Sequence, residues 1–415
     1  MTNLAKEVAM REAELLGKRG ITCVLVLAVF FIGSAWAAPA HAAEKPIKIG
    51  VILAQTGPFA SLCKLFMDGF NLSVQSAENK VAGKAVEVIW DDEGPGDPTF
   101  TMDKMRKLVE SDKVDVVVGP FNSDVRLATL AYTSVRKIPS FAVIADDAAS
   151  LKFPYSYAYD QTTWQYPRPF AWYAFDKLNI KTINIFAGDW HAGRAMTDGF
   201  AYGFTKERGG KIVGQQFASL GTTDFSSYIA AMKPADAVLV FSVPGDTAAF
   251  LSQAHQMGLF SKSKILVLGG QANVFPSMLK DLGPALVGKT WGEAVYQNAY
   301  TDSVNKKFIT DFEAKYGHKP LNMEGTGFMT GSVILGALKA AKGDTTPDKL
   351  HDAVKKLNLD TIQGKLAFTS GNPDKSGVQG VISRFIEEVK KGQDGQYFWD
   401  LTQVYPAIKP IVVSN

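Results

Sequence analysis

Short apolar runs alternate with amphipathic stretches along most of this chain. The first apolar run, IKIGVILA (47–54), has the length and β-branched content of a buried strand. The stretch that follows it, ASLCKLFMDGFNLSVQSAEN (60–79), instead repeats its apolar residues at helical spacing. These residues share one helical face and are Leu62, Leu65, Phe66, Phe70 and Val74. The pattern therefore predicts a strand followed by a helix that covers it.

The same alternation continues through the first half of the chain. Further strands are predicted at 85–92, 114–119 and 139–145. A helix is predicted to begin after Asp97, because aspartate is a good N-cap and Pro98 suits the first helical turn. Strands and helices that alternate in this way predict an α/β fold with a doubly wound parallel sheet.

The pattern starts again in the second half, after a segment without clear periodicity (153–170) that we interpret as a crossover. Strands are predicted at 182–189, 211–216, 236–242 and 264–270. Beyond about residue 300, two long helices (303–317 and 323–343) precede late strands, which are predicted at 364–370, 381–390 and 397–404. The chain is therefore predicted to form two α/β lobes of similar architecture.

The N-terminal segment does not fit this pattern. Lys18 and Arg19 precede an apolar run from Ile21 to Ile32, and Ala40-His41-Ala42 supplies the small residues that a signal peptidase recognises. The sequence predicts a secretory signal peptide over residues 1–42, so we expect the protein to be exported. An uncleaved membrane anchor is the alternative, and the shortness of the apolar run disfavours it.

Composition narrows the function further. The chain has 44 Lys and Arg against 41 Asp and Glu, a formal net charge of +3, which gives no reason to expect a nucleic-acid partner. Of the two cysteines, Cys23 falls within the signal peptide, so Cys63 would have no intrachain disulfide partner. The scattered histidines show no metal-ligand spacing, and no dinucleotide or nucleophile motif follows a strand. We therefore expect no metal, no cofactor and no enzymatic activity.

Polar and small residues gather where the predicted strands end. In an open parallel sheet, ligands bind beyond the carboxyl ends of the strands, where the following helices present unpaired N–H groups. Gly, Pro, Asn and Asp are also ordinary turn residues, which is the simpler explanation for any single loop. The whole set favours a ligand cleft, and its segments are 54–60, 119–123, 145–150, 188–193, 242–246 and 269–273.

An ordered series of segments then resembles a known family. IKIGVILAQTGPFA, VVVGPFNS, IPSFAVIA, AGDWHAGRAMTDGF and GTTDFSSYIAAMK follow one another as in the periplasmic solute-binding proteins of the leucine/isoleucine/valine type. The resemblance covers nearly all of the chain after residue 42. It implies two lobes joined by a three-crossover hinge, with lobe one at 43–162 plus 295–378 and lobe two at 163–294 plus 379–415. It also implies a clamp that delivers a small solute to the membrane permease of an ATP-driven (ABC) importer.

The resemblance also assigns site residues in the first lobe. Ser123 matches the hydroxyl residue that helps to bind the solute carboxylate, although Ser123 or Asn122 could equally cap its own helix. Ala145 and Asp146 occupy the loop that supplies backbone groups and a hydroxyl in amino-acid binders. Asp146 departs from that pattern, since a buried carboxylate suits an ammonium or a hydroxyl donor, and it could also be a helix cap. Leu62 falls where some relatives have an aromatic residue.

The second lobe departs further from the amino-acid binders. Ala192 falls where the family has a tyrosine, and Gln271 falls where leucine binders have the acidic residue that pairs with the α-ammonium. A neutral amide cannot supply that charge, which weakens the case for a branched-chain amino acid. The segment TTWQ (162–165) resembles binders of aromatic acids within the family. Aromatic and polar candidates complete the predicted site, namely Phe59, Phe121, Trp164, Gln165 and Trp190, with core packing as the alternative for both tryptophans.

The sequence thus predicts a solute-binding protein for an aromatic carboxylate or an apolar amino acid. A sensor that uses the same clamp to signal to a receptor is the first alternative. A secreted hydrolase is the second, and it would need a Ser-His-acid set that the strand ends do not show.

Overall fold

The computed structural model describes residues 44–369 and 377–408, and from Pro46 onward they belong to one compact unit. The predicted signal peptide at 1–42 lies outside the described residues. Among the residues that are described, none of the helices combines the length and apolar character needed to cross a membrane.

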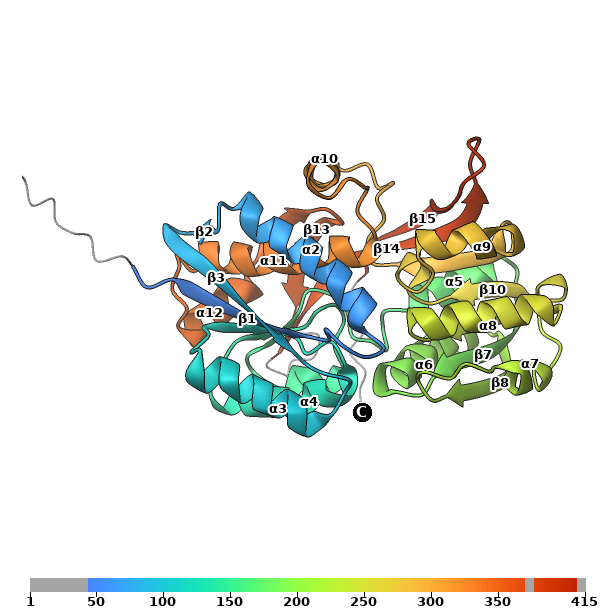
Figure 1. Cartoon of the computed structure of the whole chain (residues 1–415), viewed down its shortest axis with the longest axis horizontal. Helices are drawn as coiled ribbons and strands as arrows, with labels where there is room; N and C mark the ends of the chain where they lie inside the picture. Colours follow the sequence, from blue (N-terminus) through green and yellow to red (C-terminus); the bar gives the residue numbers. More distant parts are fainter. Residues whose placement is uncertain (1–43, 370–376, 409–415) are drawn as a thin grey trace, which may run out of the picture. The chain divides into compact units, whose positions relative to one another are not determined.

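The first half of the chain forms a mostly parallel sheet (Figure 1). Its strands are β1 (Ile47–Leu53), β2 (Lys80–Val81), β3 (Lys84–Asp92), β4 (Val116–Val118), β5 (Ser140–Phe141) and β6 (Ser156–Ala158). They lie in the order β2-β3-β1-β4-β5-β6, so the chain winds outward from β1 in both directions. The connecting helices are α2 (Ala60–Ser76), α3 (Pro98–Arg106), the π-helical turn η1 (Lys107–Ser111), α4 (Ser123–Val135) and the 3-10 helix η2 (Ala148–Lys152).

The second half repeats this architecture in a separate sheet, ordered β11-β10-β9-β7-β8 with parallel pairing throughout. The strands are β7 (Thr182–Gly188), β8 (Lys211–Ala218), β9 (Ala237–Phe241), β10 (Lys264–Val267) and β11 (Thr290–Ala294). The helical segments are α5 (Arg168–Asp176), α6 (His191–Thr205), α7 (Ser226–Ala230), α8 (Pro244–Gln256), η3 (Leu259–Ser261), η4 (Gly270–Ala272) and α9 (Pro276–Leu286). Every residue of β4 and of β9 is buried, as expected for strands covered on both faces.

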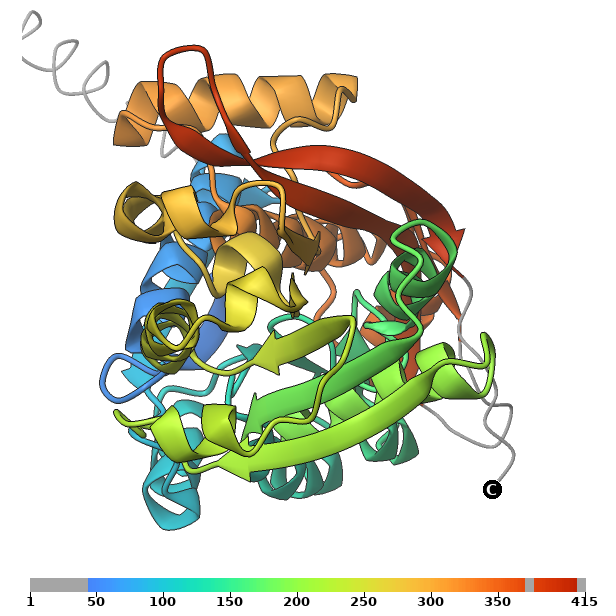
Figure 2. The ribbon, with the colours of Figure 1, turned by 90° about the vertical axis from the view of Figure 1, so that its right-hand side faces the viewer.

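The C-terminal part of the chain contributes to both sheets. Its elements are α10 (Ser303–Tyr316), α11 (Asn322–Ala340), α12 (Pro347–Lys355), β12 (Asn358–Thr361), β13 (Gly364–Thr369), β14 (Val378–Lys391) and β15 (Tyr397–Ile408). The start of β14 pairs with β6 and β13, while its later residues pair with β11 and β15. Figure 2 shows β14 and β15 as a long red ribbon of two antiparallel strands. One strand therefore passes from the first sheet into the second.

The chain passes between the sheets at three places, and one buried cation links them. The passages are the segment after β6, the segment after β11, and β14 itself. Arg384 of β14 forms an ion pair with Asp160 of the first passage, and its Nε lies 3.5 Å from Glu293 Oε1 in β11. All three side chains are completely buried. The three-crossover hinge expected from the resemblance is therefore present.

The predicted elements agree closely with this fold. Asp97 caps α3, its carboxylate accepting the Phe100 N–H at 2.7 Å, as predicted. The largest difference is the strand predicted at 139–145, which is limited to Ser140–Phe141 because the chain then leaves the sheet to form a loop. The strand pairings divide near the expected lobe boundaries, 43–162 plus 295–378 and 163–294 plus 379–415, but these boundaries stay a prediction.

Glycines set the distance between α2 and α11. A Cβ atom at Gly327 would lie 2.0 Å from Phe66 O, and one at Gly69 would lie 1.7 Å from Glu324 O. Real Cβ atoms do not approach backbone oxygen so closely, so the two helices pack backbone against backbone. We expect Gly327→Ala to lower the free energy of unfolding by at least about 1–3 kcal/mol, the usual cost of overpacking a core.

Chemical denaturation of the purified protein measures this change. Gly245→Ala is the matched control, because a Cβ there has no heavy atom within 4 Å. That control should leave stability unchanged or raise it slightly, since alanine favours helix over glycine. Equal stability of Gly327→Ala and the parent protein would show that the two helices are not held together in this way.

Candidate functional site

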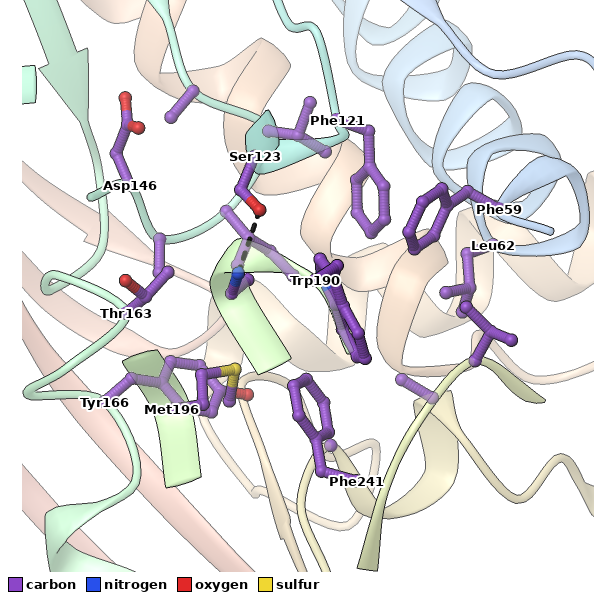
Figure 3. Close-up of a pocket in the computed structure, with 18 of the residues that line it drawn as sticks. Phe59, Leu62, Phe121, Ser123, Asp146, Thr163, Tyr166, Trp190, Met196 and Phe241 are labelled. Atoms are coloured by element: carbon purple, nitrogen blue, oxygen red, sulfur yellow. Dashed lines mark hydrogen bonds between the residues drawn. The ribbon is translucent and has the colours of Figure 1, made fainter. Parts of the chain in front are cut away.

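A cavity of about 130 Å³ lies where strand-end loops of the two sheets meet (Figure 3). The first sheet contributes the start of α2, the loop from β4 to α4, and the loop after β5. The second sheet contributes the start of α6 and the loops after β9 and β10. The cavity therefore occupies the position at which open parallel sheets bind ligands.

The loop from β4 to α4 presents Ser123 to this cavity. Gly119 takes a φ of +89°, and a Cβ there would lie 2.1 Å from Ile52 O, so only glycine lets the chain turn this close to β1. Asn122 caps α4, its Oδ1 accepting the Asp124 N–H at 2.9 Å. Ser123 is the first helical residue and not the cap, and its N–H has no acceptor among the described residues. Ser123 is thus available to a ligand.

A buried carboxylate holds the same loop from behind. Glu93 accepts the backbone N–H groups of Phe121 and Asn122 and has no exposed surface. Burial raises the pKa of Glu93 to about 7, although both N–H groups favour the charged form. Glu93 thereby fixes the direction in which the loop leaves β4.

A second buried charge joins this loop to the next one. Arg126, one turn after Ser123 on α4, donates from Nε to Asp146 at 3.0 Å. Its Nη1 donates to Gly119 O and, at 2.8 Å, to Ser140 Oγ. Burial raises the pKa of the Asp146 carboxyl and Arg126 opposes that rise, so the pair is best treated as one neutral unit. The Arg126–Asp146 pair holds together the first-lobe loops that line the cavity.

Aromatic rings form one wall of the cavity. Phe59 contacts the ring of Phe121 at 5.4 Å and that of Trp190 at 6.2 Å between centroids, and Trp190 contacts Phe241 at 5.0 Å. Figure 3 shows Phe59, Phe121 and Trp190 on one side of Ser123, with Asp146 and Thr163 on the other. The cavity therefore has an aromatic side and a polar side.

The first turn of α6 contacts the first lobe beside the cavity. The Ala192 N–H donates to Ser123 Oγ at 3.0 Å, the contact drawn in Figure 3. The His191 N–H donates to Asp124 Oδ1 at 2.9 Å, and His191 Nε2 lies 2.7 Å from Asp147 Oδ2. These contacts join the two lobes along one edge of the cavity.

Gln271 makes another contact between the lobes. Its Oε1 accepts the backbone N–H of Asn322, the first residue of α11, at 2.9 Å. Its own N–H donates to Glu387, a buried residue of β14 whose pKa is raised by burial to about 8. The side-chain amide of Gln271 is therefore used for contact between the lobes.

The structure gathers most of the predicted site residues around the cavity. Those that line it are Phe59, Leu62, Phe121, Ser123, Ala145, Asp146, Trp190 and Ala192. Asn122, Trp164, Gln165 and Gln271 are outside its lining. Trp164 instead packs on Tyr202 of α6 at 4.8 Å between ring centroids. Gln165 is buried within the turn that leads into α5, its N–H donating to Thr162 O.

For Ser123, Asp146 and Trp190 the sequence left a structural role as the alternative, namely a helix cap for the first two and core packing for the third. The cap of α4 is Asn122 and not Ser123. The cap of η2 is Asp147 and not Asp146, because Asp147 accepts the Ala149 N–H at 2.7 Å. Trp190 is 9% exposed and lines the cavity, so it is both buried and accessible to a small guest.

Several residues that line the cavity were not predicted from the sequence, although their spacing from predicted site residues could have identified them. Arg126 lies three residues after Ser123 and Met196 four after Ala192, so each shares a helical face with a residue already identified. Phe241 ends β9 next to Ser242, where the strand-end rule applies. Thr163 and Tyr166 also line the cavity, in place of Trp164 and Gln165.

This arrangement suits a small guest that has one anionic end and one flat apolar face. Ser123 offers both its N–H and its hydroxyl proton, because Ala192 uses only a lone pair of the oxygen. The positive ends of the α4 and α6 dipoles meet at this residue, which favours negative charge there.

Comparisons with known proteins agree on the family of this fold. A curated relative, Leu/Ile/Val-binding protein homolog 6 of Brucella suis biovar 1, is 28% identical over 360 residues, which cover 85% of this chain and 90% of the relative. An ABC transporter substrate-binding protein from Sphaerobacter thermophilus superposes with a TM-score of 0.80 at 26% identity, covering 89% of this chain and all of the other.

A second solved structure is similar along the same length. It is a solute-binding protein of an ABC transporter from Rhodopseudomonas palustris BisB5 in complex with 3,4-dihydroxybenzoic acid. Its TM-score is 0.78 at 25% identity, and the match covers 88% of this chain and 98% of that one. The sequence model of the periplasmic binding protein family matches residues 46–392, and this chain belongs to that family.

Proposed function

We propose that this protein is the solute-binding component of an ATP-driven importer, and that it captures a small aromatic carboxylate by closing its two lobes around it. The observation that carries this proposal is the charge balance of the cavity. Both carboxylates in its described lining already have basic partners, Asp146 with Arg126 and Asp147 with His191. An anionic solute needs no further acid, whereas an α-amino acid would need one for its ammonium.

The polar side of the cavity supports the carboxylate. A carboxylate beside Ser123 would accept from its N–H and its hydroxyl, at the meeting point of two helix N-termini. The same hydroxyl oxygen accepts the Ala192 N–H of the opposite lobe, so a bound anion and a closed cleft strengthen one another through one group.

The size and walls of the cavity support the aromatic ring. A volume of about 130 Å³ is close to the roughly 150 Å³ of a cavity known to bind benzene. The rings of Phe59, Trp190 and Phe241 provide flat apolar contact. Thr163 and Asn322 add two polar residues to the described lining.

The relatives support both the general function and a rival solute. The 25% identical structure from Rhodopseudomonas palustris contains a dihydroxybenzoate, which agrees with our proposal. The relative from Brucella suis is named for leucine, isoleucine and valine, which makes an apolar amino acid the second candidate. We propose that the chain binds without turnover, in the periplasm and beside a membrane permease. A receptor-coupled sensor would bind its solute in the same way.

The first prediction concerns the solute itself. Benzoate, 4-hydroxybenzoate and 3,4-dihydroxybenzoate are expected to raise the melting temperature of the purified protein, and leucine and valine are not. A solute at a hundred times its dissociation constant adds about 2.7 kcal/mol to the free energy of unfolding, which thermal shift readily detects. Binding of leucine alone would establish the second candidate, and loss of labelled-acid uptake on gene deletion would separate import from sensing.

The second prediction tests Ser123 as the carboxylate ligand. Ser123→Ala removes a hydrogen bond to a charged group, worth about 1.5–3 kcal/mol, and should weaken binding of the same acid roughly 10- to 150-fold in isothermal titration calorimetry. Ser134→Ala, at the opposite end of α4, is the matched control and should bind as the parent does. Unchanged affinity of Ser123→Ala would place the carboxylate elsewhere.

The third prediction compares two tryptophans that the sequence could not distinguish. Trp190 lines the cavity and Trp164 does not, so solute binding should change the fluorescence of Trp190. Trp190→Phe is expected to remove most of the solute-dependent signal and to weaken binding about three- to tenfold through lost ring contact. Trp164→Phe should preserve both. The opposite pattern would mean that the segment 162–165 holds the solute.

A further inference from the structure

His191 occupies an unusual position at the edge of the cavity. It is the first residue of α6, and its ring nitrogen Nε2 lies 2.7 Å from Asp147 Oδ2 in the opposite lobe. Its side chain is 42% exposed and that of Asp147 is 19% exposed, so water reaches the pair. The ring itself is not part of the cavity lining. His191 therefore joins the lobes without touching the solute.

The charges around this imidazole are mostly negative. From the first lobe it faces Asp147 and Asp124, whose Oδ1 accepts the His191 N–H, with Asp146 further away and neutralised by Arg126. On its own helix, Arg194 is paired with Asp189 at 2.8 Å. The N-terminus of α6 is the remaining positive influence, and it acts on His191 in every state of the cleft.

Separation of the lobes would change this balance. Asp147 and Asp124 belong to the first lobe, so an open cleft removes both from His191, while the helix dipole stays. The imidazole would then have its ordinary proton affinity or a lower one. The closed cleft alone provides the carboxylates that stabilise an imidazolium.

We propose that His191 is a positioning residue for solute capture, whose imidazole takes up a proton as the lobes close and then binds the Asp147 carboxylate. The proposal rests on the proposed function, because it describes how the same cleft closes. Nε2 gains the proton from solvent, and the resulting imidazolium donates it in a hydrogen bond to Asp147 Oδ2. Solute capture would therefore be stronger in a mildly acidic periplasm.

The direction of the pH dependence follows from linkage. The hydrogen bond to Asp147 raises the pKa of His191 in the closed structure, against the opposing effect of burial. Protonation of His191 therefore favours the closed form. This stabilisation is fully present below the ordinary histidine pKa of about 6.5, and it is lost as pH rises through the higher pKa of the closed state. Because the pair is partly exposed, we expect solute affinity to fall about two- to fivefold between about pH 6 and pH 8.5.

Proton uptake measured by calorimetry tests the proposal directly. Titrations near pH 7 with 3,4-dihydroxybenzoate, benzoate and L-leucine, each in phosphate and in Tris, give the number of protons bound per solute. The parent protein should take up a fraction of a proton from His191 when any of these probes binds. The His191→Gln variant should lack this contribution, so its proton uptake should be smaller by the same amount. Glutamine keeps a hydrogen-bonding side chain and the backbone N–H to Asp124, so a merely structural role would leave proton uptake unchanged.

Two further variants sharpen the comparison. Asp147→Asn retains a good cap for η2 but removes the carboxylate, so it should lose the same fraction. His255→Gln is the matched control, since this exposed histidine of α8 packs on Phe260 and is outside the cavity lining. Glu93, Glu324 and Glu387 also have raised pKa values. They are present in the parent and in every variant, so any protons they bind cancel when proton uptake is compared between these proteins.

The outcomes separate this proposal from the proposed function. Solute binding with equal proton uptake in the parent and His191→Gln would overturn the positioning role and leave the binding function intact. If none of the probes binds, the proposed function fails and this proposal fails with it, because both require the cleft to close on one of these solutes.

Discussion

The two lobes depend on one buried cation at the place where the chain passes between their sheets. Arg384 of β14 pairs with Asp160 of the first passage and lies close to Glu293 of β11. Removing one partner would leave an uncompensated charge in a fully buried site, which is strongly destabilising, so the passages must keep their relative positions. The Arg384 guanidinium also lies 4.4 Å from the ring centroid of Tyr166, which lines the cavity. The Arg384 guanidinium therefore contacts both the passages between the sheets and the lining of the cavity.

The cavity repeats this arrangement on a smaller scale. Its buried ionisable groups need not touch a solute, but they hold in place the loops whose groups would touch it. Glu93 holds the backbone of Phe121 and Asn122, and the Arg126–Asp146 pair joins the loop after β4 to the loop after β5. Each of these groups finds its hydrogen-bond partners within the first lobe. Ser123 is left with donors for a guest because its neighbours are already satisfied.

The sequence allowed the strands, most helices and the strand-end cleft to be predicted, because buried parallel strands and amphipathic helices differ in period. It also led to Ser123 and Trp190, both of which line the cavity. It could not decide how residues of the hinge segment turn, and the structure presents Thr163 and Tyr166 to the cavity in place of Trp164. Apolar periodicity gives no information on buried charges such as Arg126, whose partner lies twenty residues further along the chain.

A neutral side chain at Gln271 connects the proposed solute class with lobe closure. An acid at this position could serve an α-ammonium, but it would also have to be desolvated whenever the cleft closed on a solute without that charge. A neutral amide avoids that cost, and here its oxygen accepts the first N–H of α11 from the opposite lobe. Gln271 thus joins the lobes directly. With the acids of the described lining paired to Arg126 and His191, the function proposed above assigns the anion to Ser123 and the helix N-termini, and the shape of the solute to the aromatic rings.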